Sequence, residues 1–213
     1  MPETSPDKVW NVLLVGVGGQ GVVLASDILA AAALEAGWDV KKSEIHGMSQ
    51  RGGSVFSHVR FGPQVHSPTI PVGEVDVLAS LERIEVLRWA GWARPGAAVA
   101  YVDHDIHPQG VRTYDPGVDA EIARLFGVAI RFEDHGLKSR ISAKVKNTAL
   151  LGAISLLVPI PVEAFRVAMD RHVPAGTTQV NTVAFDVGRE IGAAALASAG
   201  ATPVEAQEPA HVE

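Results

Sequence analysis

Apolar runs and stretches with helical periodicity alternate along most of the chain. Residues 9–15 form a largely apolar run without alternation, which predicts a buried parallel strand. The alanine-rich stretch 20–36 that follows predicts a helix, and Gly37 stands where a C-cap glycine is expected. Residues 54–61 alternate between apolar and polar positions, as in a strand with two different faces. The same reasoning predicts further strands at 39–43, 75–79, 97–102, 111–114 and 129–132. It predicts further helices at 82–89, 118–126, 142–157, 162–171 and 180–197.

This order of elements defines the fold class that we expect. Strands that alternate with helices predict a Rossmann-like, doubly wound α/β sheet, mostly parallel, followed by a helical C-terminal third. The length of 213 residues fits one domain, which we place at 9–196. The segments 1–8 and 197–213 are polar or rich in Pro, Glu, Gln and Ala, so we expect disordered tails there.

A glycine-rich turn directly follows the first predicted strand. Residues 16–22 read GVGGQGV and contain the spacing G-x-G-x-x-G. Such a turn places backbone amides at the N-terminus of a helix, where an anion is favoured. The candidate binding residues of this turn are Gly16, Gly18, Gly19, Gln20 and Gly21. The alternative interpretation is that the glycines only let the helix pack closely on the strand.

The residues around the turn narrow the class of ligand. A phosphate-binding P-loop needs Lys and then Ser or Thr after its last glycine, and Val22 and Val23 stand there instead. A dinucleotide fold needs an acidic residue about 20 positions further on, to bind the ribose hydroxyls. Asp39 and Glu44 lie near that spacing, and Glu44 is the better candidate because Asp39 comes early in its strand. Binding of NAD or FAD therefore stays open.

A second polar segment, residues 44–53 (EIHGMSQRGG), follows the second predicted strand. Its guanidinium group offers bidentate recognition of a carboxylate or phosphate. Ligands of open α/β sheets bind outside the carboxyl ends of the strands, so we expect this segment and the glycine turn along one edge. The alternative is a rigid connector whose polar groups meet each other or a partner chain. The candidate residues are His46, Ser49, Gln50, Arg51 and Gly52.

Composition excludes several other functions. The net charge of -6 argues against a nucleic-acid-binding protein. The chain contains no cysteine, so it cannot form disulfides or supply thiolates to an iron–sulfur cluster. The histidines are spaced too loosely for a zinc motif. The basic run at 138–146 indicates a solvated face, or one that meets a phosphate or an acidic partner. The start of the chain has neither a signal-peptide nor a membrane-anchor pattern, which favours a cytoplasmic protein.

Five segments carry a family resemblance. The stretches 12–22 (VLLVGVGGQGV), 44–60 (EIHGMSQRGGSVFSHVR) and 71–82 (PVGEVDVLASLE) resemble the gamma-type subunit or domain of 2-oxoacid:ferredoxin oxidoreductases. The stretches 147–154 (NTALLGAI) and 181–188 (NTVAFDVG) are similar to the C-terminal signatures of that family. The resemblance runs from about residue 9 to 191 and is strongest for the arylpyruvate branch.

The resemblance implies one subunit of a larger enzyme. In such an enzyme a 2-oxoacid loses CO2 on thiamine diphosphate, coenzyme A accepts the acyl group, and ferredoxin takes the electrons. This chain has no GDG motif and no cysteine. Thiamine diphosphate, magnesium and [4Fe–4S] clusters are therefore expected on a large alpha subunit, and this chain is expected to be inactive alone, with no catalytic or metal-binding residue of its own.

The same resemblance assigns a role to the two candidate segments. It implies that the glycine turn, with Ser49, Gln50 and Arg51, faces coenzyme A or the partner subunit. Two other functions stay open: a subunit of a pyruvate or other 2-oxoacid enzyme, and a stand-alone NAD- or FAD-binding protein.

Overall fold

One mixed sheet forms the centre of the molecule. The computed structural model describes residues 8–46, 53–106, 117–207 and 209. In this part of the chain, β1, β4, β5 and β6 are parallel, whereas β3 is antiparallel to both β1 and β2. The prediction of a mostly parallel α/β sheet is therefore confirmed. In the order in which they lie side by side, the strands are β2 Asp39–His46, β3 Ser54–Gly62, β1 Trp10–Val17, β4 Val75–Ser80, β5 Ala93–Asp103 and β6 Val128–Glu133.

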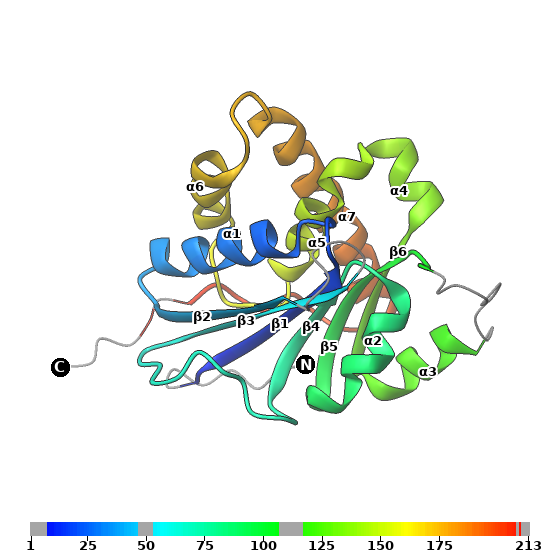
Figure 1. Ribbon diagram of the computed structural model, residues 1–213, viewed down its shortest axis with the longest axis horizontal. Helices are drawn as coiled ribbons and strands as arrows, with labels where there is room; N and C mark the ends of the chain where they lie inside the picture. Colours follow the sequence, from blue (N-terminus) through cyan, green and yellow to red (C-terminus); the bar gives the residue numbers. More distant parts are fainter. Residues whose placement is uncertain (1–7, 47–52, 107–116, 208, 210–213) are drawn as a thin grey trace.

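Helices cover both faces of this sheet (Figure 1). The helices are α1 Val22–Glu35, α2 Arg83–Trp89, α3 Val118–Leu125, α4 Asp134–Arg140, α5 Lys146–Ile154, α6 Val162–His172 and α7 Thr178–Ser198, with short 3₁₀ turns at Ala90–Trp92 and Ala143–Val145. Helices α1, α5, α6 and α7 lie on one face, and α2 and α3 lie on the other. Of the helices that the structure describes, none has the length and apolar character needed to cross a bilayer.

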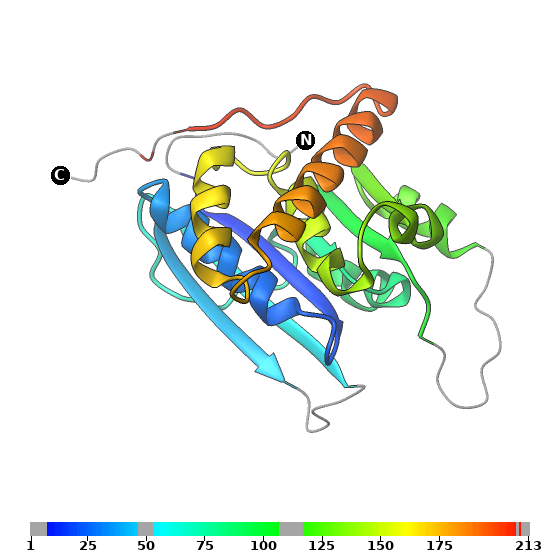
Figure 2. The ribbon, with the colours of Figure 1, turned by 90° about the horizontal axis from the view of Figure 1, so that it is seen from above.

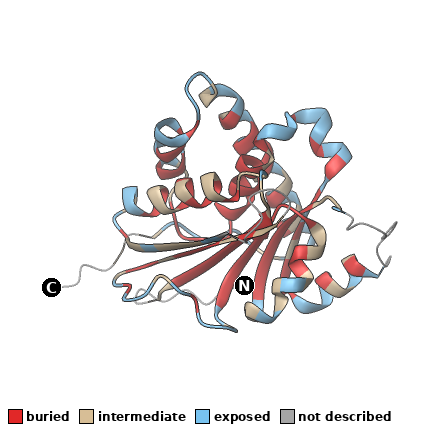
Figure 3. Ribbon diagram, viewed as in Figure 1, coloured by how far each residue is buried: buried red, intermediate tan, exposed pale blue. Residues whose placement is uncertain are grey.

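Strand β1 shows why an unbroken apolar run predicts a central strand. The side chains of Val12 and Leu14 belong to the core beneath α1 and α5, and those of Leu13 and Val15 belong to the core beneath α2. All four are at most 2% exposed. The strand therefore needs apolar residues at every position, and Figure 3 shows the central strands buried between helices whose outer faces are exposed.

Strand β3 runs opposite to its neighbours, so the sheet is not built from parallel strands alone. A parallel connection needs about a dozen residues or more, and only residues 47–53 join β2 to β3. The chain therefore turns back, and β3 fills the space between β1 and β2. The alternating pattern of residues 54–61 fits this antiparallel position.

Several predicted boundaries move. Strand β2 continues to His46, and β5 begins at Ala93 rather than at residue 97. Helix α4 was not expected, and the helix predicted at 142–157 is a 3₁₀ turn followed by α5. The strand predicted at 111–114 lies outside the described residues.

Part of the expected C-terminal tail packs on the domain. Helix α7 extends through Ser198. Beyond it, the backbone N–H of Val204 donates to the carbonyl of Leu156 at 2.9 Å, and that of Gln207 donates to Pro159 at 3.0 Å. Figure 2 shows this segment, coloured red, running back from the end of α7 across the molecule. These two bonds hold the segment that follows α7 against the domain.

Helices α5 and α7 cross at unusually close range. A Cβ atom added to Gly188 would lie 1.9 Å from the carbonyl oxygen of Ala149, and one added to Gly152 would lie 2.1 Å from that of Phe185. Each glycine therefore faces the backbone of the opposite helix. This crossing also places the N-terminus of α5 beside the glycine turn.

Candidate functional site

The glycine turn between β1 and α1 is held by the side chain of Gln20. The Oε1 atom of Gln20 accepts from the backbone N–H of Val17 at 2.7 Å, and Nε2 donates to the carbonyl of Leu81 at 3.2 Å. The amide of Gln20 therefore ties the turn to the end of β4. The ligand- or partner-facing role expected for Gln20 stays a prediction, and in the structure its amide supports the turn.

The glycines of this turn have different roles. Gly21 caps α1 in the left-handed region, with φ of 84°. A Cβ atom there would lie 2.7 Å from Nδ2 of Asn147, which donates to the carbonyl of Gly21 at 3.2 Å. A Cβ on Gly16 would lie 2.7 Å from Oε1 of Gln20. Side chains from Gln20 and Asn147 thus leave no room for a Cβ atom at Gly16 and Gly21. Gly19 differs, because it has a φ of 97° and, apart from its own chain neighbours, no atom of the described residues lies within 4 Å of its Cβ position.

A hollow of ≈ 490 Å³ opens beside this turn. It is lined by Gly18, Gly19 and the first residues of α1. Helix α1 has no side-chain cap and no acidic residue in its first turn, so the positive end of its dipole has no anionic side chain of its own helix there. Asp27 also lines the hollow, and its carboxylate pairs with the ammonium of Lys42, which in turn pairs with Glu44. An approaching anion therefore meets backbone amides and a carboxylate that is already paired.

The second candidate segment begins and ends at the same edge. The backbone N–H of Gly18 donates to the carbonyl of Gly53 at 2.9 Å, and His46 is in register with Val55, which is itself in register with Gly16. The prediction that both segments share one edge of the sheet is thus confirmed for the ends of the loop. Ser49, Gln50, Arg51 and Gly52 lie outside the described residues, as does the side chain of His46.

Two buried glutamates support this edge, and sequence reasoning missed them. Glu82 is 2% exposed, and its carboxylate accepts from the backbone N–H groups of Glu85 (2.8 Å) and Ile106 (3.1 Å). Burial raises the pKa of Glu82. Glu85 is 5% exposed and accepts from the hydroxyl of Ser54 at 2.8 Å, one residue after the loop ends. Glu82 caps helix α2, but glutamate is not among the preferred N-cap residues, so the sequence carries no clear signal for this role.

The geometry disfavours the dinucleotide interpretation. In that fold the ribose-binding acid ends a strand next to β1, but here β3 lies between β1 and β2, which separates them by about 10 Å. Glu44 pairs with Lys42. The carboxylate of Asp39 accepts from the backbone N–H of Val65 at 2.7 Å. Both candidate acids therefore have partners within the chain.

The other polar residues considered from the sequence have structural roles. His58 is 1% exposed, burial lowers its pKa, and Nδ1 accepts from the backbone N–H of Ile70 at 3.2 Å. In the basic run, Lys138 and Lys146 pair with Asp134. Burial tends to raise the pKa of Asp134, but hydrogen bonds from these two lysines outweigh it and lower the pKa to about 2. No three His, Asp or Glu side chains of the described segments gather as a metal site would require.

Comparison with known proteins identifies relatives that match most of the chain. It is 36% identical to the indolepyruvate oxidoreductase subunit IorB of Pyrococcus horikoshii over 193 residues, which covers 85% of this chain and 95% of that one. The subunit of the same name from Thermococcus kodakarensis matches equally well. More distant is the 2-oxoglutarate synthase subunit KorC of Methanocaldococcus jannaschii, at 30% identity over 189 residues.

Solved structures share the fold. The gamma subunit of a keto/oxoacid ferredoxin oxidoreductase from Geobacter sulfurreducens superposes with a TM-score of 0.67 at 24% identity, over 88% of this chain and 98% of that one. The 2-oxoglutarate:ferredoxin oxidoreductase of Magnetococcus marinus gives a TM-score of 0.70 at 23% identity, and 96% of this chain matches 34% of that longer chain. A family model described as pyruvate ferredoxin/flavodoxin oxidoreductase matches residues 11–191. With this match and relatives 36% identical over almost their full length, the chain belongs to the pyruvate ferredoxin/flavodoxin oxidoreductase family.

Proposed function

We propose that this chain is the non-thiamine subunit of an indolepyruvate, or arylpyruvate, ferredoxin oxidoreductase of the cytoplasm. The observation that carries this assignment is the 36% identity to subunit IorB over 95% of its length, against 27–30% for the KorC relatives from methanogens. The complete enzyme releases CO2 from the 2-oxoacid, transfers the acyl group to coenzyme A and passes electrons to ferredoxin. A pyruvate-type or other 2-oxoacid substrate is the alternative.

The residues of this chain define its share of the reaction. Without cysteine it has no thiolate ligand for a cluster, and the described residues contain no grouped metal ligands. We therefore assign thiamine diphosphate, magnesium and the [4Fe–4S] clusters to a large alpha subunit, which also meets ferredoxin. This chain then contributes a binding surface, and it is inactive by itself.

We place that surface at the carboxyl edge of the sheet, around the glycine turn. The uncapped start of α1 and the open position beside Gly19 favour an anionic group in the hollow. The bond between Gly18 and Gly53, together with the register of His46 against Val55, supports this placement, because it sets the two described ends of the loop that contains Arg51 at the same edge of the sheet as the hollow. Coenzyme A is an anion of suitable chemistry, and the Magnetococcus marinus relative was solved with coenzyme A bound. The surface thus presents coenzyme A to the thiamine-bearing subunit.

Reconstitution with the large subunit tests this function. The complex should reduce ferredoxin when indolepyruvate and coenzyme A are both present, and either chain alone should not. Indolepyruvate and phenylpyruvate should give a higher kcat/KM than pyruvate or 2-oxoglutarate. A higher kcat/KM for pyruvate would instead identify the chain as a subunit of a pyruvate-type enzyme. Tight binding of NAD by the isolated chain, with no gain of activity in the complex, would refute the assignment.

A variant of the loop tests the placement of coenzyme A. Arg51→Ala should raise the KM for coenzyme A about tenfold or more, because a charge-assisted bond to a phosphate is lost, while the KM for indolepyruvate stays near that of the wild type. Arg166→Ala is the matched control, since Arg166 is an exposed arginine that pairs with Asp186 away from this edge. If Arg51→Ala changes neither assembly nor coenzyme A dependence, the surface has only a structural role.

A further inference from the structure

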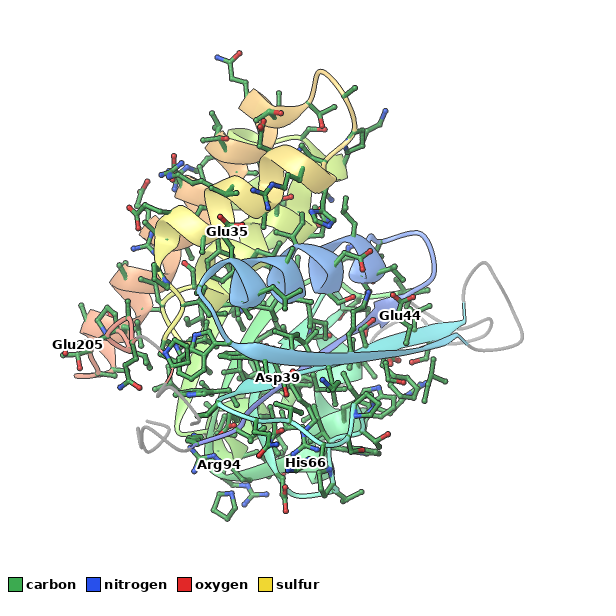
Figure 4. All side chains as sticks on the ribbon, turned by 90° about the vertical axis from the view of Figure 1, so that its left-hand side faces the viewer. Glu35, Asp39, Glu44, His66, Arg94 and Glu205 are labelled. Carbon is green, nitrogen blue, oxygen red and sulfur yellow. The ribbon has the colours of Figure 1, made fainter. Side chains whose placement is uncertain are left out.

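We propose that a cavity at the amino edge of the sheet binds an oxyanion group, a phosphate or a carboxylate, through Arg94 and Lys8. The cavity has a volume of ≈ 420 Å³ and is lined by residues at the starts of β1, β4 and β5. It lies at the other end of the strands from the glycine turn. Figure 4 shows this separation, with Glu44 labelled near one end of the sheet and Arg94 near the other.

One buried carboxylate organises the cations of this cavity. Asp76 is 1% exposed, and its Oδ2 atom accepts from the backbone N–H of Asn11 at 2.9 Å. Its Oδ1 atom is shared, because it lies 2.7 Å from Nζ of Lys8 and 2.6 Å from Nε of Arg94. The ammonium of Lys8 also lies 4.0 Å from the centre of the Trp10 ring, which holds it in place. Asp76 thus holds the ammonium of Lys8 and the guanidinium of Arg94 side by side at the cavity.

A third cation adds to the positive potential. Arg60 donates from Nε to the side-chain oxygen of Asn11 at 2.8 Å, and from Nη1 to the carbonyls of Ser67 and Thr69, each at 3.1 Å. These partners are all uncharged, so they satisfy the guanidinium without neutralising it. Glu74 also lines the cavity, but it is exposed, where solvent screens its charge. The cavity is therefore suited to an anion rather than a cation.

The guanidinium of Arg94 supplies the second, independent observation. Its Nη2 atom is buried and has no hydrogen-bond partner in the described part of the chain, although Nε is bonded to Asp76. A buried donor without an acceptor is unfavourable, and it is rare in folded proteins. An oxyanion in the cavity would accept from Nη2 and would complete the planar fork that arginine uses for phosphates and carboxylates. This site does not depend on the proposed function of the opposite edge.

Anion titration of the full-length chain tests the site. Binding is measured by calorimetry and by thermal unfolding, with potassium phosphate or potassium acetate at constant ionic strength made up with chloride. We expect saturable binding of at least one of the two anions and a matching rise in the unfolding temperature. A tighter response to phosphate assigns a phosphate-bearing ligand, and a tighter response to acetate assigns a carboxylate.

Variants of the cavity separate this site from other anion sites. Arg94→Lys retains the charge beside Asp76 but lacks the fork, and should bind the preferred anion about tenfold more weakly. Arg124→Lys, at an exposed arginine paired with Glu121 on α3, should bind like the wild type. If Arg94→Lys does not fold, Lys8→Gln takes its place, with the same expected loss.

Two results would overturn the proposal. The first is that neither phosphate nor acetate shows saturable binding above the chloride baseline. The second is that both Arg94→Lys and Lys8→Gln bind the anion as tightly as the wild type. The second result would mean that the anion binds elsewhere, for example at the glycine turn. Loss of this site would leave the coenzyme A dependence of the complex unchanged, so the two proposals fail independently.

Discussion

The substitution Gly188→Ala tests the close crossing of α5 and α7. The added methyl group would lie 1.9 Å from the carbonyl oxygen of Ala149, where an ordinary contact is about 3.4 Å. The contact is with the backbone of a buried helix, so the helices must separate by more than an ångström or the crossing must twist. Overpacking of a core costs about 1–3 kcal/mol and occasionally more. The higher helix propensity of alanine offsets only about 0.5–1 kcal/mol.

Because the clash is with rigid backbone, the overpacking cost should fall at the upper end of its range, and we expect Gly188→Ala to lower the free energy of unfolding by about 2–2.5 kcal/mol. For a domain of this size that corresponds to a fall of roughly 4–10 °C in the unfolding temperature. Urea unfolding followed by circular dichroism measures the free energy directly. Gly136→Ala, within helix α4, is the matched control, because among the described side chains the Cβ would meet Glu133 alone, at an ordinary contact distance of 3.6 Å. The free energy of unfolding of Gly136→Ala should equal or exceed that of the wild type. The same stability for Gly188→Ala and the wild type would refute the packing argument.

Three further substitutions test the supports of the carboxyl edge. Asn147→Ala should cost about 1 kcal/mol and raise the KM for coenzyme A in the complex, because the bond to the carbonyl of Gly21 is lost. Gln20→Leu should cost about 1–2 kcal/mol in urea unfolding, since it leaves two backbone groups of the turn without their partner. Asp134→Asn should cost about 2 kcal/mol at pH 7, because Lys146 loses its charged partner. The pKa of Asp134 is lowered, so its contribution is present above its ordinary pKa of 3.8 and is lost as the pH falls through about 2. Acid unfolding of Asp134→Asn should therefore lack the part of the pH dependence that falls in this window.

The strands and helices near the N-terminus are the part of the fold that could be predicted most directly. The apolar run of β1 and the alanine-rich α1 differ in period, and the glycines between them give a turn that is local in the chain. The direction of β3 was harder to predict from the sequence, although the connection 47–53 is too short for a crossover between parallel strands. Helix α4 was missed because Leu137 is the one large apolar residue among its seven residues, so the segment shows no apolar periodicity.

The candidate site was predicted in position but not in detail. Sequence reasoning placed the glycine turn and the ends of the following loop at one edge, and the bond between Gly18 and Gly53 confirms this placement. The inward direction of Gln20 was not predictable, since its partner Leu81 lies 61 residues away. The contact of Asn147 with Gly21 spans 126 residues, so only the folded chain reveals it.

The sequence by itself determined the class of fold, the glycine turn at the start of a helix and the absence of thiolate ligands. These follow from the spacing of apolar residues, from the turn residues and from the composition, which can all be read without the tertiary structure. The tertiary structure alone decided which polar groups are already satisfied and which remain available. It turned Gln20 and Asn147 into supports of the glycine turn, and it left Nη2 of Arg94 buried without a partner among the described residues. The physical reason is that the hydrogen-bond partner of a buried polar group is chosen by long-range packing, which no single segment of the chain specifies.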